Sequence, residues 1–191
     1  MLSYLAENFD LPILDWIAEH IWCPFWDAIM PVITALGNGG IFWIAVAVVL
    51  MLIPKYRKAG FSMGAALLMG LLLCNLTLKP LVARIRPYDY QLENFGVSIQ
   101  LLIKTPHDFS FPSGHTIASF EAATALLLHN RKLGIPAMVL ASLIAFSRLY
   151  LYVHYPTDVI ASILLGVGLA FLGSWLVKKG YCVYETKKLS K

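Results

Sequence analysis

The stretch SRLYLYVHYPTD, from Ser147 to Asp158, places an arginine, a histidine and an aspartate where two apolar runs meet. Residues 133–146 carry no charged side chain, and residues 159–177 carry none either. About 20 apolar residues in a helix cross a bilayer core, so each run with its flanks predicts one membrane span. Charged groups are costly in such a setting and usually mark a functional site.

The composition of the whole chain also indicates a membrane protein. The 191 residues are 59% hydrophobic and 14% charged, whereas soluble domains are about half apolar and about a quarter charged. The net charge of +4 would suit nucleic acid in a soluble protein, but in a membrane protein the distribution of charge matters more. We therefore expect membrane lipids, and not nucleic acid, as partners.

Three more apolar runs predict further spans, at residues 41–53, 59–78 and 116–128, the last of which contains Glu121. Residues 1–36 interleave tryptophans, acidic residues and prolines, which is typical of helices lying in the membrane interface. The predicted fold is an all-α polytopic membrane bundle with five spans, or six if residues 1–36 cross. We divide the chain into interfacial residues 1–36, a transmembrane bundle of residues 37–178 and a basic tail of residues 179–191.

The positive charges predict the orientation of this bundle. Alternating spans place three basic clusters on one side, and the positive-inside rule makes that side cytoplasmic, together with the C-terminus. The clusters are Lys55, Arg57 and Lys58, then Arg131 and Lys132, then Lys178, Lys179, Lys187, Lys188 and Lys191. Five other cations break the rule by falling at the outer, periplasmic or extracellular face: Lys79, Arg84, Arg86, Lys104 and Arg148.

Three polar segments meet at this outer face in the predicted topology. They are KPLVARIRP (Lys79–Pro87), PSGH (Pro112–His115) and the segment Ser147–Asp158. Arginine forks match phosphate oxygens in bidentate fashion, and lysine adds a point charge. A helix that begins near Ser113 and Gly114 would offer its hydroxyl, N–H groups and dipole to an anion. The sequence therefore predicts a phosphate pocket with Lys79, Arg86, Arg148, Ser113 and Gly114.

Two histidines in this pocket could carry out phosphoryl transfer. One histidine can attack phosphorus while the other protonates the leaving oxygen. Asp158 follows His154 by four residues, and a carboxylate there would fix the tautomer of the imidazole and support its positive charge. The sequence has no acidic cluster that suggests a divalent metal, so we predict neither a metal nor another cofactor.

The three segments together resemble the signature of the type-2 phosphatidic acid phosphatase superfamily, which also includes the vanadium haloperoxidases. The family pattern is K, six residues and RP, then PSGH, then SR, five residues, H, three residues and D. This chain matches every position of the pattern, with Lys79, Arg86 and Pro87, then Pro112–His115, then Ser147, Arg148, His154 and Asp158.

The resemblance implies a role for each matched residue. His154 would be the nucleophile that forms a phosphohistidine, Asp158 would orient it, and His115 would act as general acid and then as general base. The phosphate would be held by Lys79, Arg86, Ser113, Gly114 and Arg148. The implied activity is metal-independent hydrolysis of a lipid phosphate or diphosphate, such as phosphatidate, phosphatidylglycerophosphate or undecaprenyl diphosphate.

Other interpretations stay open at this point. A transporter or binding protein for anions or lipid phosphates could use the same basic residues, and a haloperoxidase could bind vanadate there. Arg84 and Lys104 are expected to be anchors that extend to the interface. For Glu121 we favour a buried, hydrogen-bonded carboxylate over a catalytic one. Residues 88–111 form a predicted long outer loop, either at the lipid entrance or as a simple connector.

Overall fold

The computed structural model describes residues 2–189, and every regular element in that range is a helix. The predicted all-α fold is therefore confirmed. The N-terminal elements are α1 (Leu2–Leu5), the π-helix η1 (Ala6–Asp10), α2 (Leu11–His20), α3 (Pro24–Ala35), the 3₁₀ turn η2 (Asn38–Gly40) and α4 (Ile41–Leu52). Then follow α5 (Arg57–Gly70), the π-helix η3 (Leu71–Leu78), α6 (Lys79–Val82), α7 (Pro87–Phe95), α8 (Gly114–His129), α9 (Arg131–Tyr150) and α10 (Pro156–Leu189).

Helix α8 forms the centre of the bundle. Ten of its sixteen residues are buried, and it packs against α5, α9 and α10. Small side chains on α8 let these neighbours approach closely, as helix packing in a membrane requires; Ala122, Ala123 and Ala125 are completely buried. The PSGH segment at the start of α8 is thereby fixed inside the bundle rather than on its surface.

The outer surface of the bundle is apolar, as expected for a membrane protein. Leu68 on α5, Leu72 on η3 and Leu164 on α10 each expose at least half of their surface. Three helical stretches of residues 2–189 are long and apolar enough to cross a membrane: Arg57–Phe95, Arg131–Tyr150 and Pro156–Val183. The bent pair α3 and η2–α4, with a 41° break, makes a fourth if it is one broken span. The number of five to six spans stays a prediction.

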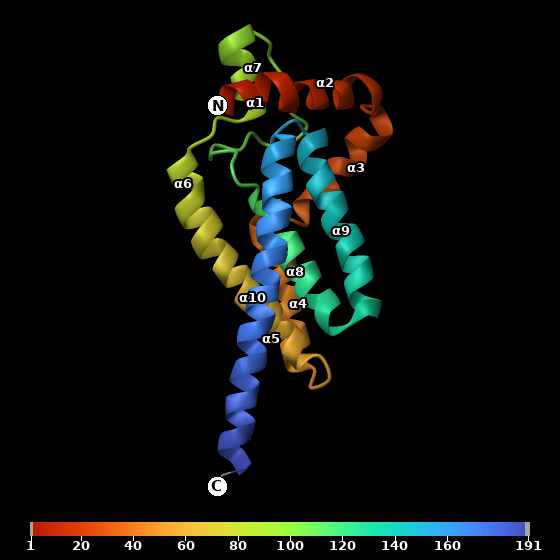
Figure 1. Ribbon diagram of the computed structural model, residues 1–191. Helices are drawn as coiled ribbons and strands as arrows, with labels where there is room; N and C mark the ends of the chain where they lie inside the picture. The colour runs from red at the N-terminus through yellow and green to blue at the C-terminus, as the bar shows by residue number, and fades with distance from the viewer. Residues whose placement is uncertain (1, 190–191) are drawn as a thin grey trace.

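The N-terminal helices cover one end of the bundle. In Figure 1, α1 and α2 lie across the top of the upright helices, and α3 descends from the end of α2 into the bundle. Buried Leu11, Leu14 and Ile17 share a hydrophobic cluster with Tyr152 and Tyr155, which follow α9. The segment is therefore packed onto the connection between α9 and α10.

The predicted loop of residues 88–111 is partly helical, which corrects the sequence interpretation. Its first part belongs to α7, which has Pro87 at its first turn and ends at Gly96 with φ of 68°. Both are common helix boundary signals, because proline fixes a helical φ and glycine tolerates a left-handed one. Residues 97–113 contain no helix. This segment passes beside α6, α8 and the α9–α10 connection, which are the elements that carry the predicted site.

Candidate active site

Most of the predicted site residues line one cavity of about 740 Å³. Six of the eight do so, although they come from three separate segments of the chain: Lys79, Arg86, Gly114, His115, Arg148 and His154. Ser113 and Asp158 are also fully buried, but they lie behind the cavity wall, in contact with Ser162 and Ser110 respectively. The fold therefore gathers the three sequence segments into a single place.

His154 lies in the connection between α9 and α10 and is almost completely buried. The Nη1 group of Arg86 is 3.2 Å from its Nε2 atom. Because arginine can only donate, Nε2 carries the lone pair and the proton belongs on Nδ1. Burial, followed by the positive charges of Arg86 and Arg148, lowers the pKa of His154 well below its usual value. The imidazole is therefore neutral, with a free electron pair facing the cavity cations.

Asp158 approaches the other side of the His154 ring. Its Oδ2 atom lies 3.6 Å from Nδ1 of His154, slightly beyond hydrogen-bonding distance. The same oxygen accepts hydrogen bonds from the Ser110 hydroxyl at 2.5 Å and from the Tyr155 N–H at 3.1 Å. The Oδ1 atom is bound by Arg84 at 2.5 Å. The carboxylate is thus fixed from three directions beside the imidazole.

Arg84 is a buried structural cation, and its interpretation as an interfacial anchor was wrong. Only 7% of its surface is exposed. Its Nη1 group binds Asp158 and its Nη2 group binds Asp10 at 2.7 Å. The guanidinium also stacks over the Tyr155 ring, with 3.8 Å between its carbon and the ring centroid. An arginine at the end of an apolar run looks the same in sequence whether it reaches the interface or turns inward.

Asp108 neutralises two of the three cations that were predicted to hold phosphate. Its carboxylate binds the Lys79 ammonium through Oδ2 and the Nη2 group of Arg86 through Oδ1. Arg86 also donates from Nε to the Asp108 carbonyl at 2.7 Å and from Nη1 to the Val153 carbonyl at 2.6 Å. With the contacts to His154 and the Phe109 carbonyl, every N–H of Arg86 has a partner.

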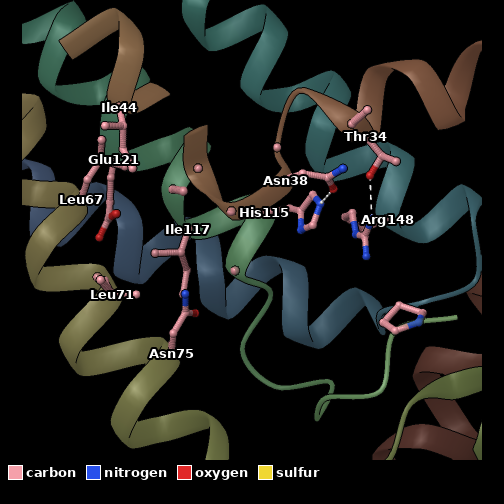
Figure 2. A pocket seen from close by; sticks show the side chains of 18 of the residues that line it. Thr34, Asn38, Ile44, Leu67, Leu71, Asn75, His115, Ile117, Glu121 and Arg148 are labelled. Atoms are coloured by element: carbon pink, nitrogen blue, oxygen red, sulfur yellow. Dashed lines mark hydrogen bonds between the residues drawn. The ribbon is translucent and has the colours of Figure 1, made fainter. Parts of the chain in front are cut away.

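Arg148 projects into the cavity from the end of α9. One of its terminal nitrogens donates to Thr34 on α3 at 2.6 Å, and its buried Nε atom has no hydrogen-bond partner among the described residues. Figure 2 shows Arg148 and His115 on neighbouring walls, each tied to the α3–η2 segment by one hydrogen bond. Arg148 is therefore a buried cation whose Nε–H group is available to donate a further hydrogen bond.

The start of α8 brings His115 to the cavity. Ser113 caps the helix, since its Oγ accepts from the N–H and the hydroxyl of Thr116. Its own N–H donates to Ser162 at 2.9 Å, so this N–H is not turned toward an anion. His115 contacts the Asn38 Oδ1 atom through Nε2 at 2.9 Å, and an amide oxygen as acceptor places the proton on Nε2.

The cavity continues from these polar groups into an apolar arm. Figure 2 shows Ile44, Leu67, Leu71 and Ile117 along this arm, with Glu121 between Ile44 and Leu67. Glu121 is 1% exposed, and its Oε1 atom has no hydrogen-bond partner among the described residues. The expectation of a hydrogen-bonded carboxylate is thus wrong for this oxygen. Lys104, expected to be an anchor, also lines the cavity.

Several residues of the site were missed by sequence reasoning. Ser110 and Asp108 lie just before PSGH, and Asn38 lies in the glycine-rich turn, so their proximity to recognised segments was an available signal. Asp10 and Thr34 carried no local signal, because their partners Arg84 and Arg148 are 74 and 114 residues away in the chain.

Comparisons with known proteins find a family model, relatives and solved structures that are similar to this chain. A family model described as the PAP2 superfamily matches residues 55–181. An undecaprenyl-diphosphatase of Sulfolobus acidocaldarius is 34% identical over 139 residues, which are 72% of this chain and 65% of that protein. The chain thus spans slightly less than two thirds of this relative.

Two solved structures resemble the whole bundle. One is Aquifex aeolicus LpxE, with a TM-score of 0.72 and 25% identity, covering 86% of this chain and 93% of that one. The other is a transmembrane PAP2 type phosphatidylglycerolphosphate phosphatase from Bacillus subtilis, with a TM-score of 0.68 and 27% identity. That similarity covers 93% of this chain and 90% of the other.

Proposed function

This chain belongs to the PAP2 superfamily, and from that premise we propose that it is a membrane phosphatase that hydrolyses a lipid phosphate or diphosphate through a phosphohistidine. The observation that carries the proposal is the cavity itself. The three cations assigned to phosphate and two histidines occupy one end, and an apolar arm leads away from them. A soluble phosphate would need only the polar end, whereas a lipid phosphate would use both parts.

The proposed first step is attack by His154. Its Nε2 lone pair forms a bond to phosphorus while the bond from phosphorus to the leaving oxygen breaks and its electron pair stays on that oxygen. His115 enters this step doubly protonated: its Nε2–H stays hydrogen-bonded to Asn38, and its Nδ1–H is transferred to the leaving oxygen, which leaves a neutral imidazole. The Nδ1–H of His154 faces Asp158 and Ser110, so the positive charge that develops on the ring meets a carboxylate.

The second step regenerates the enzyme. His115 now acts as a base and takes a proton from water, whose oxygen attacks phosphorus. The bond between phosphorus and Nε2 breaks, and its electrons return to the imidazole. Lys79, Arg86 and Arg148 stabilise the negative charge of the phosphoryl oxygens in both steps. These cations do the work that a metal ion does in other phosphatases.

Substrate and orientation are also part of the proposal. The names of the relatives suggest undecaprenyl diphosphate and phosphatidylglycerophosphate as candidate substrates, and phosphatidate shares their chemistry.

We place the active site at the periplasmic or extracellular face of the cell membrane and the C-terminus in the cytoplasm. The distribution of lysine and arginine supports this orientation.

Phosphate release by purified protein in detergent, with EDTA present, tests the function. We expect release from at least one of the three lipids, faster than from a soluble phosphate ester. His154→Ala should abolish release, because a covalent nucleophile has no substitute. His20→Ala is the matched control, since His20 is an exposed histidine on α2 that lies against the Trp16 carbonyl and ring, away from the cavity. Native protein that binds these lipids without releasing phosphate would favour the transporter or binding interpretation.

A further inference from the structure

The N-terminal segment reaches the catalytic centre through one buried ion network. Asp10, at the end of η1, is fully buried. Its Oδ2 atom accepts from Arg84 at 2.7 Å and from the Thr157 hydroxyl at 2.8 Å, and its Oδ1 atom accepts from the Thr157 N–H at 2.9 Å. Arg84 in turn donates to Asp158, the carboxylate beside His154.

This network contains more negative groups than positive groups. Arg84 is one cation between two fully buried carboxylates, Asp10 and Asp158, so the three groups together carry one negative charge when ionised. If Asp10 were absent, Arg84 would neutralise Asp158 alone. With Asp10 present the arginine is shared, and Asp158 retains negative charge that can act on the Nδ1–H of His154.

The geometry also requires an arginine. Its planar fork binds one carboxylate at each terminal nitrogen and lies flat on the Tyr155 ring, which a lysine ammonium cannot reproduce. In addition, Asp10 binds the N–H and the hydroxyl of Thr157 in the first turn of α10. Asp10 therefore controls both the cation that holds Asp158 and the helix turn on which Asp158 stands.

We propose that Asp10 is a positioning residue for the reaction, acting through Arg84 and the first turn of α10 to hold the Asp158 carboxylate in place beside His154. The inference rests on the proposed function and extends it to the N-terminal segment. That segment is then part of the catalytic apparatus, although it lies outside residues 55–181 that match the family.

The test compares Asp10→Asn with a matched control. Asparagine has the same shape and can still accept from the Thr157 N–H, but it brings no charge to Arg84. Asp15→Asn is the control, because Asp15 also attaches the N-terminal helices to the α9–α10 connection, through the Tyr152 hydroxyl at 2.6 Å, without contacting Arg84. A purely structural role predicts similar effects for both variants.

We expect Asp10→Asn to lower kcat by about tenfold to a hundredfold and to change KM by less than about twofold, as outer contacts of a catalytic group do. Arg84→Lys should behave similarly, whereas Asp15→Asn should leave kcat within about twofold of native. Equal losses in Asp10→Asn and Asp15→Asn, or an unchanged kcat in Asp10→Asn, would overturn the inference while the proposed function stands.

A second measurement does not depend on turnover. In protein labelled with ¹⁵N-histidine, the Nδ1 resonance of His154 is identified by its loss in His154→Ala. It should shift in Asp10→Asn and stay in place in Asp15→Asn, because only the first variant changes the charge at Asp158. An identical spectrum in both variants would refute the positioning role even if no substrate were hydrolysed.

Discussion

The Asp108 carboxylate competes with a bound anion for the cations of the cavity. Its carboxylate bridges Lys79 and Arg86, which are two of the three cations that we assign to phosphate. Burial alone would raise its pKa, but the hydrogen bond and charge of Lys79, followed by those of Arg86, outweigh burial and lower the pKa well below the ordinary value. Asp108 is therefore ionised at any physiological pH, and a phosphate must displace it or share its cations.

Removing that charge should strengthen the binding of inorganic phosphate. We expect Asp108→Asn to lower the inhibition constant of orthophosphate by about threefold to tenfold, a modest effect because the Asp108 side chain is half exposed. The measurement is inhibition of lipid phosphate hydrolysis at fixed pH. Glu93→Gln removes an exposed charge from α7 and serves as the control. An unchanged or higher constant would mean that Asp108 and phosphate occupy different places.

At the scale of single residues, the sequence predicts those site residues that stand at a fixed spacing within a motif. Lys79, Arg86, His115, Arg148 and His154 were identified because they stand in a fixed order at the ends of apolar runs, and the fold brings all five to one cavity. The pairs that Arg84 forms with Asp10 and Asp158 were not predicted, since each joins residues 74 positions apart. Neither periodicity nor local composition carries information about such contacts.

Among the elements, the glycine-rich turn between α3 and α4 has the most direct effect on chemistry. Gly39 and Gly40 adopt φ of 57° and 66°, a left-handed conformation that glycine adopts without steric cost. The turn places Asn38 against His115 at 2.9 Å. It also places Gly37 so close to the imidazole that an added Cβ would lie 2.6 Å from its Cδ2 atom. The position of His115 is therefore set by this turn.

A single methyl group at Gly37 should displace His115, the proposed general acid. We expect Gly37→Ala to reduce kcat by about tenfold or more, because a displacement of about 1 Å in a catalytic group has effects of that order, while the protein still folds. Steady-state kinetics and thermal unfolding in detergent measure the two quantities. Gly168→Ala is the matched control, since an added Cβ on α10 meets no atom within 4 Å. Full activity in Gly37→Ala would show that His115 does not need its observed position.

The helices themselves were largely predictable, and the exceptions have physical causes. All five apolar runs lie in helices, because burial in lipid requires every backbone group to be satisfied within its own segment. Helix α7 was missed because its sequence, PYDYQLENF, is mostly polar and was interpreted as loop. The π-helical turns of η3 were also missed, since they depend on packing around residues 71–78 and have no pattern of their own.

The whole molecule has two chemically different ends. The polar part of the cavity is lined by residues of α6, the start of α8 and the α9–α10 connection, and these elements lie toward the end crossed by α1 and α2, with α7 beside them (Figure 1). The basic clusters around Lys58 and Arg131 lie at the opposite end, where Lys58 on α5 lies over the Tyr181 ring of α10 at 4.9 Å and Ser62 contacts His129 of α8 at 2.9 Å. The sequence predicted this separation from charge alternation, and it implies one orientation in the membrane.

Cysteine labelling can determine that orientation directly. Cys182 is exposed near the basic end on α10, so in a Cys23→Ser and Cys74→Ala background it is the single thiol. We expect a membrane-impermeant maleimide to leave Cys182 unlabelled in sealed spheroplasts and to label it after permeabilisation, because the positive-inside rule predicts that this basic end faces the cytoplasm. Glu93→Cys with Cys182→Ser in the same background places the thiol on α7 and should be labelled without permeabilisation. The reverse pattern would put the active site in the cytoplasm, where its lipid phosphates would come from the inner leaflet.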